Sequence, residues 1–137
     1  MERTFAIIKP DAVAAGHTGD IIRIIEKKGF RIVAMKKLRM SKAEAQAFYA
    51  VHRKQKFYRS LVKFMTEGPC VVMVLEGENA IAKWRALMGP TEPAHAGRGT
   101  IRKSYGTDIE RNAVHGSDSP ATAATEVPFF FSTAELL

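Results

Sequence analysis

One histidine of this chain has neighbours that suit phosphate chemistry. His115 lies in the heptad Asn-Ala-Val-His-Gly-Ser-Asp, residues 112–118, with a glycine directly after it and an asparagine before it. Neutral imidazole is a good nucleophile near pH 7, so such a histidine could carry a covalently bound group between two substrates. The other histidines, His17, His52 and His95, fall in expected loops or on helix surfaces, and we expect them to be solvated.

A set of cationic and polar residues elsewhere in the chain could surround this histidine. They are Lys9, Arg85, Thr91, Arg102 and Asn112. A phosphoryl group in transit spreads negative charge over its oxygens, so its transfer is catalysed mainly by positioning and by fixed positive charges. The signatures GxxxxGK[ST], GxGxxG, HExxH, CxxC and GxSxG are absent, which argues against a P-loop or protein-kinase mechanism.

The charge and composition narrow the class of protein. A formal net charge of +7 predicts an anionic substrate or partner, and both nucleotides and nucleic acid fit. Hydrophobic residues make up 46% and charged residues 26% of 137 residues, which indicates one ordinary globular domain over residues 1–137. The longest apolar run near the amino terminus, 5–8, is too short for a signal peptide or membrane span, so we expect a cytoplasmic protein. The single cysteine, Cys70, reads as part of a buried strand.

Hydrophobic periodicity predicts the elements that hold these residues. We expect strands at residues 4–9, 30–40, 70–75 and 113–115. We expect helices at about 21–28, 41–49, 61–65 and 81–88, and one after Ser119-Pro120. Ser41 and Glu44 form a capping box, and residues 91–111 have no period, which is typical of a long functional loop. Trp84 is expected in the core, while its neighbour Arg85 faces the site.

The order βαββαβ predicts an α+β fold of the α/β class. We expect a ferredoxin-like, antiparallel four-stranded sheet with helices on one face, an added helical hairpin and the long loop. The tail 127–131 carries three consecutive phenylalanines, and the chain ends in Leu136-Leu137. So much apolar surface is either tucked into this core or buried against another subunit.

The heptad 112–118 resembles the active-site signature of the nucleoside diphosphate kinase family, an asparagine and two mostly apolar residues followed by His-Gly-Ser-Asp. Further similarities run in order along essentially the whole chain. They are Ile8-Lys9-Pro10-Asp11, Phe48-Tyr49, Gly68-Pro69, Arg85 with Met88-Gly89, Thr91, Pro93 and Gly99-Thr100-Ile101-Arg102. The chain is similar to bacterial members of the family that have a short carboxyl end.

The resemblance implies an enzyme that moves the γ-phosphate of a nucleoside triphosphate, mainly ATP, to a nucleoside diphosphate. It implies a ping-pong mechanism through a phosphohistidine at His115, which maintains the CTP, GTP, UTP and deoxynucleotide pools. In this picture His115 attacks through Nδ1, Glu126 holds its other ring nitrogen, and Tyr49 and Ser117 sit beside it.

The resemblance also implies a nucleotide site. By position, Phe57 stacks on the base, and Lys9 and Asn112 reach the ribose hydroxyls. The phosphates are expected to contact Arg85, Thr91 and Arg102. Stacking without base-edge contacts would tolerate any base. Mg²⁺ is expected to arrive with the nucleotide, because the sequence shows no dedicated carboxylate cage and hence no direct protein ligand.

Family members of this length assemble from dimers, so we expect a homo-oligomer, with a hexamer favoured over a tetramer and residues 91–111 at the contact. Two alternatives stay open: a basic nucleic-acid-binding module and a pure scaffold on the same fold. Scattered positive residues and weak aromatic interleaving argue against the first, so nucleic-acid binding would be at most incidental.

The chain departs from the family pattern in four places. Gln55-Lys56 replaces a common Arg-Pro before Phe57, which puts the pose of that ring in doubt. Ser104 stands where an aspartate is common, and Thr18 stands where an aliphatic residue is usual. The acidic residue common in the loop after Tyr49 is missing. None of these positions is expected to handle phosphate.

Overall fold

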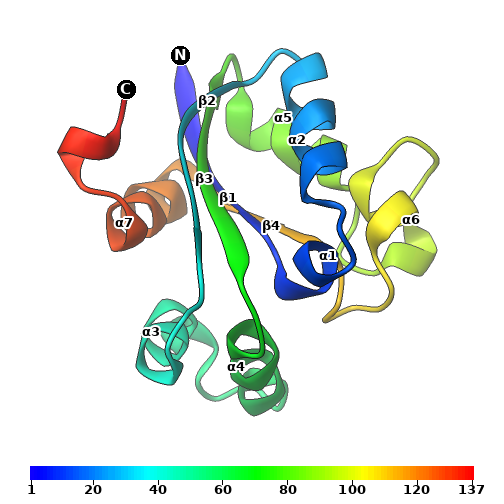
Figure 1. Ribbon diagram of the computed structural model, residues 1–137, viewed down its shortest axis with the longest axis vertical. Helices are drawn as coiled ribbons and strands as arrows, with labels where there is room; N and C mark the ends of the chain where they lie inside the picture. Colours follow the sequence, from blue (N-terminus) through cyan, green and yellow to red (C-terminus); the bar gives the residue numbers. More distant parts are fainter.

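The computed structural model describes residues 1–137, which are organised around a four-stranded antiparallel sheet (Figure 1). Its strands are β1 (Glu2–Ile8), β2 (Arg31–Leu38), β3 (Cys70–Gly77) and β4 (Val114–Gly116). They lie in the order β2-β3-β1-β4, and every neighbouring pair is antiparallel. This order places β3 between β1 and β2, as a split βαβ unit requires, and confirms the ferredoxin-like fold.

Seven α-helices surround the sheet. They are α1 (Pro10–Ala14), α2 (Thr18–Lys27), α3 (Lys42–Phe48), α4 (Tyr58–Thr66), α5 (Ala80–Met88), α6 (Ile101–Tyr105) and α7 (Pro120–Phe130). Short 3₁₀ turns lie at Ala50–His52, Pro93–His95 and Thr133–Glu135. None of the helices is both long and apolar enough to span a membrane.

Both faces of the sheet are covered, so the prediction of helices on one face is wrong. Helices α2 and α5, with α1 and α6, pack on the face that carries Ala6 and Ile8. The hairpin α3–α4 and helix α7 pack on the face that carries Phe5 and Ile7 (Figure 1). Because successive residues of a strand point to opposite faces, a central strand covered on both sides is apolar at every position. The wholly buried run of β1 from Thr4 to Ile8 follows from this arrangement.

Two short helices, α1 and α6, were not predicted from the sequence. Pro10 ends β1 as predicted, but it also occupies the first turn of α1, a position that suits proline. Helix α6 interrupts the expected loop 91–111 and is capped by Thr100, whose Oγ1 accepts a hydrogen bond from Lys103 N at 3.3 Å. Five residues are too few to show an amphipathic period, which explains both omissions.

Most local signals are confirmed. The capping box of α3 is present, and Ser119 caps α7 by accepting a bond from Thr122 N at 3.2 Å. Trp84 and Cys70 are fully buried, and burial raises the pKa of the Cys70 thiol to about 11. The last part of the tail lies within this core, because Phe130 and Phe131 are buried there.

The capping box of α3 generates a stability prediction. Ser41 Oγ accepts a bond from Glu44 N at 3.0 Å, and Glu44 Oε1 accepts one from Ser41 N at 2.8 Å. Ser41→Ala should lower the free energy of unfolding by about 1 kcal/mol, because the first turn loses a partner for its amide. Urea denaturation measures the change. Ser104→Ala, at an exposed serine of α6, is the control and should alter stability by less than about 0.5 kcal/mol.

Candidate active site

His115 lies on β4 with one ring nitrogen bound and the other free. Strand β4 has three residues and lies at the edge of the sheet, and its pairing with β1 places His115 opposite Ile7. His115 Nε2 lies 3.2 Å from Glu126 Oε1 on α7, and both side chains are largely buried. A carboxylate beside Nε2 favours the tautomer in which Nε2–H donates to it. Nδ1 has no protein partner and therefore keeps its lone pair.

Ser117 connects Glu126 to strand β1 through hydrogen bonds. Its Oγ donates to the same Glu126 oxygen at 2.7 Å. The backbone amide of Phe5 donates to Ser117 Oγ at 3.3 Å, and Ser117 N donates to Phe5 O at 3.1 Å. The structure therefore brings His115, Ser117 and Glu126 together as one hydrogen-bonded group.

Trp84 explains the glycine after the histidine. Its Nε1 donates to His115 O at 3.2 Å, so the indole lies directly against β4. A Cβ on Gly116 would lie only 2.5 Å from Trp84 Cδ1, closer than any real Cβ contact. A core residue thus fixes the backbone of the histidine and excludes a side chain from the next position.

Aromatic rings line the histidine on the side of the α3–α4 hairpin. The ring of Phe48 lies 5.7 Å from that of His115 and packs edge-on against Tyr49 at 4.9 Å. Tyr49 is buried, and its hydroxyl has no hydrogen-bond partner. Burial raises the pKa of Tyr49, so this phenol stays neutral at physiological pH.

Asn112 joins three separate segments beside the histidine. Its Oδ1 accepts a bond from Lys9 Nζ at 2.9 Å. Its Nδ2 donates to Thr91 O at 3.1 Å and to Ile109 O at 3.0 Å. The structure therefore brings the predicted residues Lys9, Thr91 and Asn112 together through one side-chain amide.

Arg102 is buried and holds three backbone carbonyls. Nη1 donates to Gly89 O at 2.8 Å, Nη2 to Val114 O at 2.8 Å, and Nε to Asn112 O at 3.3 Å. Gly89 ends α5 with a φ of 84°, a conformation that glycine adopts without strain. These bonds fix the guanidinium between α5 and β4, and two of its five N–H hydrogens stay available.

The cations of the site repel one another. Burial, together with the charge of Arg102, lowers the pKa of Lys9 to about 8. Burial also lowers the pKa of Arg102 to about 10, with a contribution from Arg85. Arg85 is exposed and forms an ion pair with Asp118 Oδ1, at a position that is itself exposed. An anion bound among these groups would relieve the repulsion, since opposite charge favours the protonated forms.

Phe57 lies at the start of α4 with 47% of its surface exposed. The His52 ring packs against it at 5.3 Å, and His17 packs against Tyr105 at 4.6 Å. The expectation that all three other histidines are solvated is therefore right only for His95, because these two are half-buried.

The departures from the family pattern lie mostly on the surface. Gln55, Lys56 and Ser104 are exposed, and Thr18 is half-buried at the start of α2. None of them forms a hydrogen bond with a predicted site residue. The bonds of Asn112 with Lys9, Thr91 and Ile109 therefore form without them.

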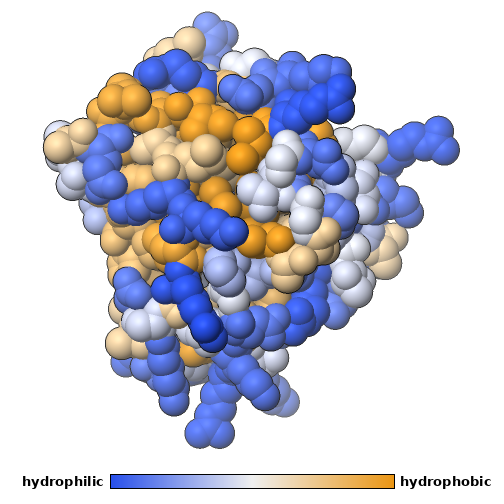
Figure 2. Space-filling model, viewed as in Figure 1, coloured by the Kyte–Doolittle hydropathy of each residue, from blue (hydrophilic) through white to orange (hydrophobic).

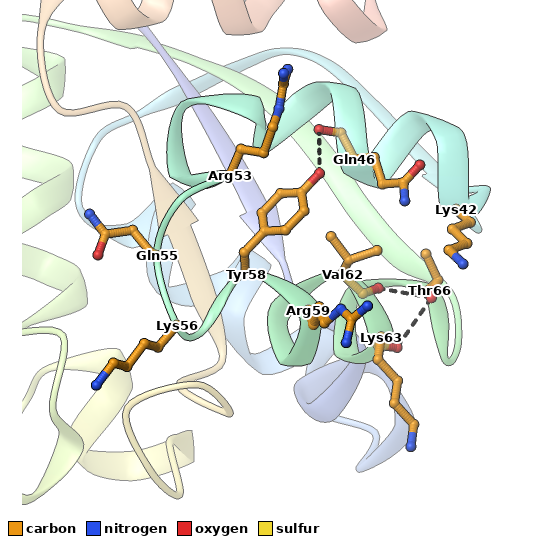
Figure 3. Close-up of a pocket in the computed structure, with 10 residues that line it drawn as sticks. All are labelled: Lys42, Gln46, Arg53, Gln55, Lys56, Tyr58, Arg59, Val62, Lys63 and Thr66. Atoms are coloured by element: carbon orange, nitrogen blue, oxygen red, sulfur yellow. Dashed lines mark hydrogen bonds between the residues drawn. The ribbon is translucent and has the colours of Figure 1, made fainter.

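A hollow of about 810 Å³ lies at the α3–α4 hairpin (Figure 3), and its lining includes Lys56 and Tyr58, the two chain neighbours of Phe57. Five cations and no carboxylate line it, namely Lys42, Arg53, Lys56, Arg59 and Lys63. In Figure 3 their side chains point in different directions, so they offer no converging set of donors for an anion. This hollow is a solvated cationic surface, and no group of three or more His, Cys, Asp or Glu residues is placed to hold a metal ion.

Two residues beside the site, Asp11 and Ile109, were not predicted to have a role there. Asp11 Oδ2 accepts a bond from Ala113 N at 3.1 Å, and Ile109, 62% exposed, follows Asp108 in the loop that Asn112 closes. The only signal for Asp11 was its place in the family-like stretch 8–11. No sequence signal pointed to Ile109, because a single isoleucine in a loop is not part of a periodic pattern or a motif.

Comparison with known proteins extends these observations to the whole chain. A family model described as nucleoside diphosphate kinase matches residues 2–136. The nucleoside diphosphate kinase of Geobacter sulfurreducens is 59% identical over 137 residues, and that of Geobacter sp. strain M21 is 58% identical; each match covers 100% of both chains.

Solved structures agree. A crystal form of the Aquifex aeolicus nucleoside diphosphate kinase matches with a TM-score of 0.98 and 44% identity, covering 99% of each chain. The halophilic enzyme of Halobacterium salinarum, in complex with CDP, matches with a TM-score of 0.96 and 41% identity over 99% of this chain and 91% of that chain. This chain therefore belongs to the nucleoside diphosphate kinase family of phosphotransferases.

Proposed function

We propose that His115 is the phosphate carrier of this kinase. The observation that supports the proposal best is an imidazole whose Nε2 is held by Glu126 and whose Nδ1 is free, in a site that also buries the cations Lys9 and Arg102. Burial and like charge both oppose protonation of such cations, so the site is poised to receive a polyanion. The terminal phosphates of a nucleoside triphosphate are such a polyanion.

In the first half-reaction, the Nδ1 lone pair attacks the γ-phosphorus. The bond from the γ-phosphorus to the bridging oxygen breaks, and the nucleoside diphosphate leaves with that oxygen. The ring now carries positive charge, which Glu126 offsets through its contact with Nε2–H, while Ser117 keeps the carboxylate in place. In the second half-reaction, a terminal oxygen of another diphosphate attacks the same phosphorus, and the Nδ1–P bond breaks. The neutral ring is regenerated, which gives ping-pong kinetics.

The remaining predicted residues position the nucleotide. We assign base stacking to the exposed ring of Phe57, and the ribose hydroxyls to Lys9 and Asn112. We assign binding of the phosphates to the cations Arg85 and Arg102. Thr91 joins them through its side chain, since its carbonyl is already bound to the Asn112 amide. Tyr49 is uncharged and packs against Phe48, which supports that ring beside His115. Because stacking reads no base edge, the enzyme should accept all common bases.

Magnesium belongs to the substrate in this proposal. No carboxylate cluster of the chain could hold it, and Asp118 is already paired with Arg85. Mg²⁺ prefers to bind phosphate oxygens and to keep several waters, so it would enter as the Mg-nucleotide complex. Its chemistry there is to neutralise charge on the transferred group.

We infer a homo-oligomer, with a hexamer favoured and a tetramer as the alternative, built from one 1–137 domain per subunit. Strand β2 is an edge strand with one unpaired side, and Met35 on it is 49% exposed. Figure 2 shows hydrophobic surface over β2 and β3, while hydrophilic side chains gather over α3 and α4. An open edge beside apolar surface favours pairing with another chain. Free nucleotides are the substrates, so we place the enzyme in the cytoplasm.

Removal of the nucleophile tests the central assignment. His115→Ala should lower kcat on the order of 10³-fold or more, because the imidazole that carries the phosphoryl group is lost. ATP labelled in its γ-phosphate should give the wild type an acid-labile, alkali-stable label on His115 that a nucleoside diphosphate removes. His95→Ala, at an exposed histidine, is the matched control and should label normally.

Two results would count against this assignment. Label on another residue would displace His115 as the carrier. Absence of any phosphotransfer, together with salt-dependent oligonucleotide binding that survives His115→Ala, would favour the nucleic-acid-binding alternative. A scaffold would bind no nucleotide at all.

The buried charge of Lys9 predicts a pH-dependent stability. The pKa of Lys9 is about 8 in the folded chain against an ordinary 10.5, so the folded state binds fewer protons between these values. Wild type should therefore gain up to about 3 kcal/mol of unfolding free energy, relative to Lys9→Met, as pH rises from 8 to 10.5. Urea denaturation of both proteins at pH 7 and pH 10 measures the change. A difference that stays constant with pH would show that Lys9 carries no such cost.

The assembly is tested by light scattering after size exclusion. The expected mass is six times that of the chain, which is the mass of the favoured hexamer. Met35→Lys places a charge on this surface and should shift the population to smaller species. A stable wild-type monomer at micromolar concentration would contradict the inference.

A further inference from the structure

The backbone just before the histidine adopts a strained turn. Ala113 has a φ of +73°, although it is not a glycine, and Val114 N donates to Asn112 O at 2.9 Å. A bond between residues two apart around a central φ near +75° is a γ-turn of the classic type, which is rare and strained. Alanine has no side-chain group that could stabilise the left-handed conformation, so the surrounding structure must hold it.

This turn sets the geometry between two site residues. Asn112 before it binds Lys9, and His115 follows it by two positions. If Ala113 relaxed to a negative φ, the Asn112 amide and the His115 ring would move relative to each other. A displacement of about 1 Å can slow a positioned reaction by roughly 10²-fold.

Four hydrogen bonds hold the turn in place. Lys9 N donates to Ala113 O at 2.8 Å, and Arg102 donates to Asn112 O at 3.3 Å and to Val114 O at 2.8 Å. The fourth runs from Ala113 N to Asp11 Oδ2 at 3.1 Å, and it is the only side-chain contact to a polar group of Ala113. None of the other three bonds involves the Ala113 amide. If Asp11 is removed, this amide therefore has no hydrogen-bond partner.

Asp11 has few competing contacts. It lies in the first turn of α1, directly after Pro10, so its backbone is fixed. Its second carboxylate oxygen, Oδ1, is buried without any hydrogen-bond partner. Burial also raises the pKa of the Asp11 carboxyl, which means that the fold keeps this group in place at a cost.

We propose that Asp11 is a positioning residue that holds the γ-turn at Ala113 and thereby aligns Asn112 with His115. The inference rests on the proposed role of His115. Asp11 acts through the backbone and needs its acceptor oxygen for this role. Its negative charge serves the nearby Lys9 only as a weaker effect, since burial and Arg102 outweigh it.

The test compares two substitutions at Asp11. Asp11→Ala removes the acceptor and should slow single-turnover phosphorylation of His115 by at least about tenfold, well below the melting temperature of the variant. Asp11→Asn loses the charge but keeps an oxygen that accepts from Ala113 N, so it should retain at least half of the wild-type rate. Equal losses in the two variants would overturn the proposal in favour of a charge effect.

A double-variant cycle isolates the turn. Glycine occupies a positive φ without strain, so in the Ala113→Gly background the Asp11→Ala substitution should cost less than threefold in rate. An undiminished loss in that background would overturn the proposal. If Asp11→Ala fails to fold, Asp11→Asn is compared with wild type instead, and a drop of tenfold or more would overturn it.

The wild-type protein separates the two failures. Without label on wild-type His115, the proposed phosphate carrier itself would be wrong. With normal label on the wild type and an equally fast Asp11→Ala variant, only the role of Asp11 would fall.

Discussion

The burial of Lys9 and Arg102 close to each other is the constraint around which the site is built. Lys9 donates to the Asn112 amide and Arg102 donates to backbone carbonyls, and these acceptors carry dipoles but no net charge. Hydrogen bonds of this kind allow a cation to be buried without neutralising it. The positive field is therefore kept for a ligand, and it would be lost if carboxylates paired with both groups.

The same bonds hold together segments that are far apart in the sequence. Arg102 on α6 joins the end of α5 to β4, and Asn112 joins Lys9, which follows β1, to the stretch between α5 and α6. Neither α6 nor β4 is long enough to be stable by itself, since helices and strands of this size need tertiary contacts. The short elements of the site are thus ordered largely by the polar groups that perform its chemistry.

The sequence predicted elements that have a period and motifs that are local. Four strands, five helices and the caps at Ser41 and Ser119 were found because each depends on residues close in the chain. The two covered faces of the sheet could not be read, because period-two alternation disappears in a strand that is buried on both sides. The roles of the site residues came from a family resemblance, and the bonds that join them depend on tertiary structure.

Asp11 shows why some contacts of the site could not be predicted from the neighbouring residues in the sequence. Nothing near Asp11 in the chain indicates that its partner is Ala113, and nothing in the heptad 112–118 indicates a positive φ at an alanine. Elsewhere local preference and global fold agree, as the cap of α7 illustrates. Around residues 112–115 they conflict twice, once through backbone strain and once through uncompensated charge. Selection for stability alone would remove both the backbone strain and the buried charge. Because both occur next to one histidine, we infer that function, and not stability, determines the structure there.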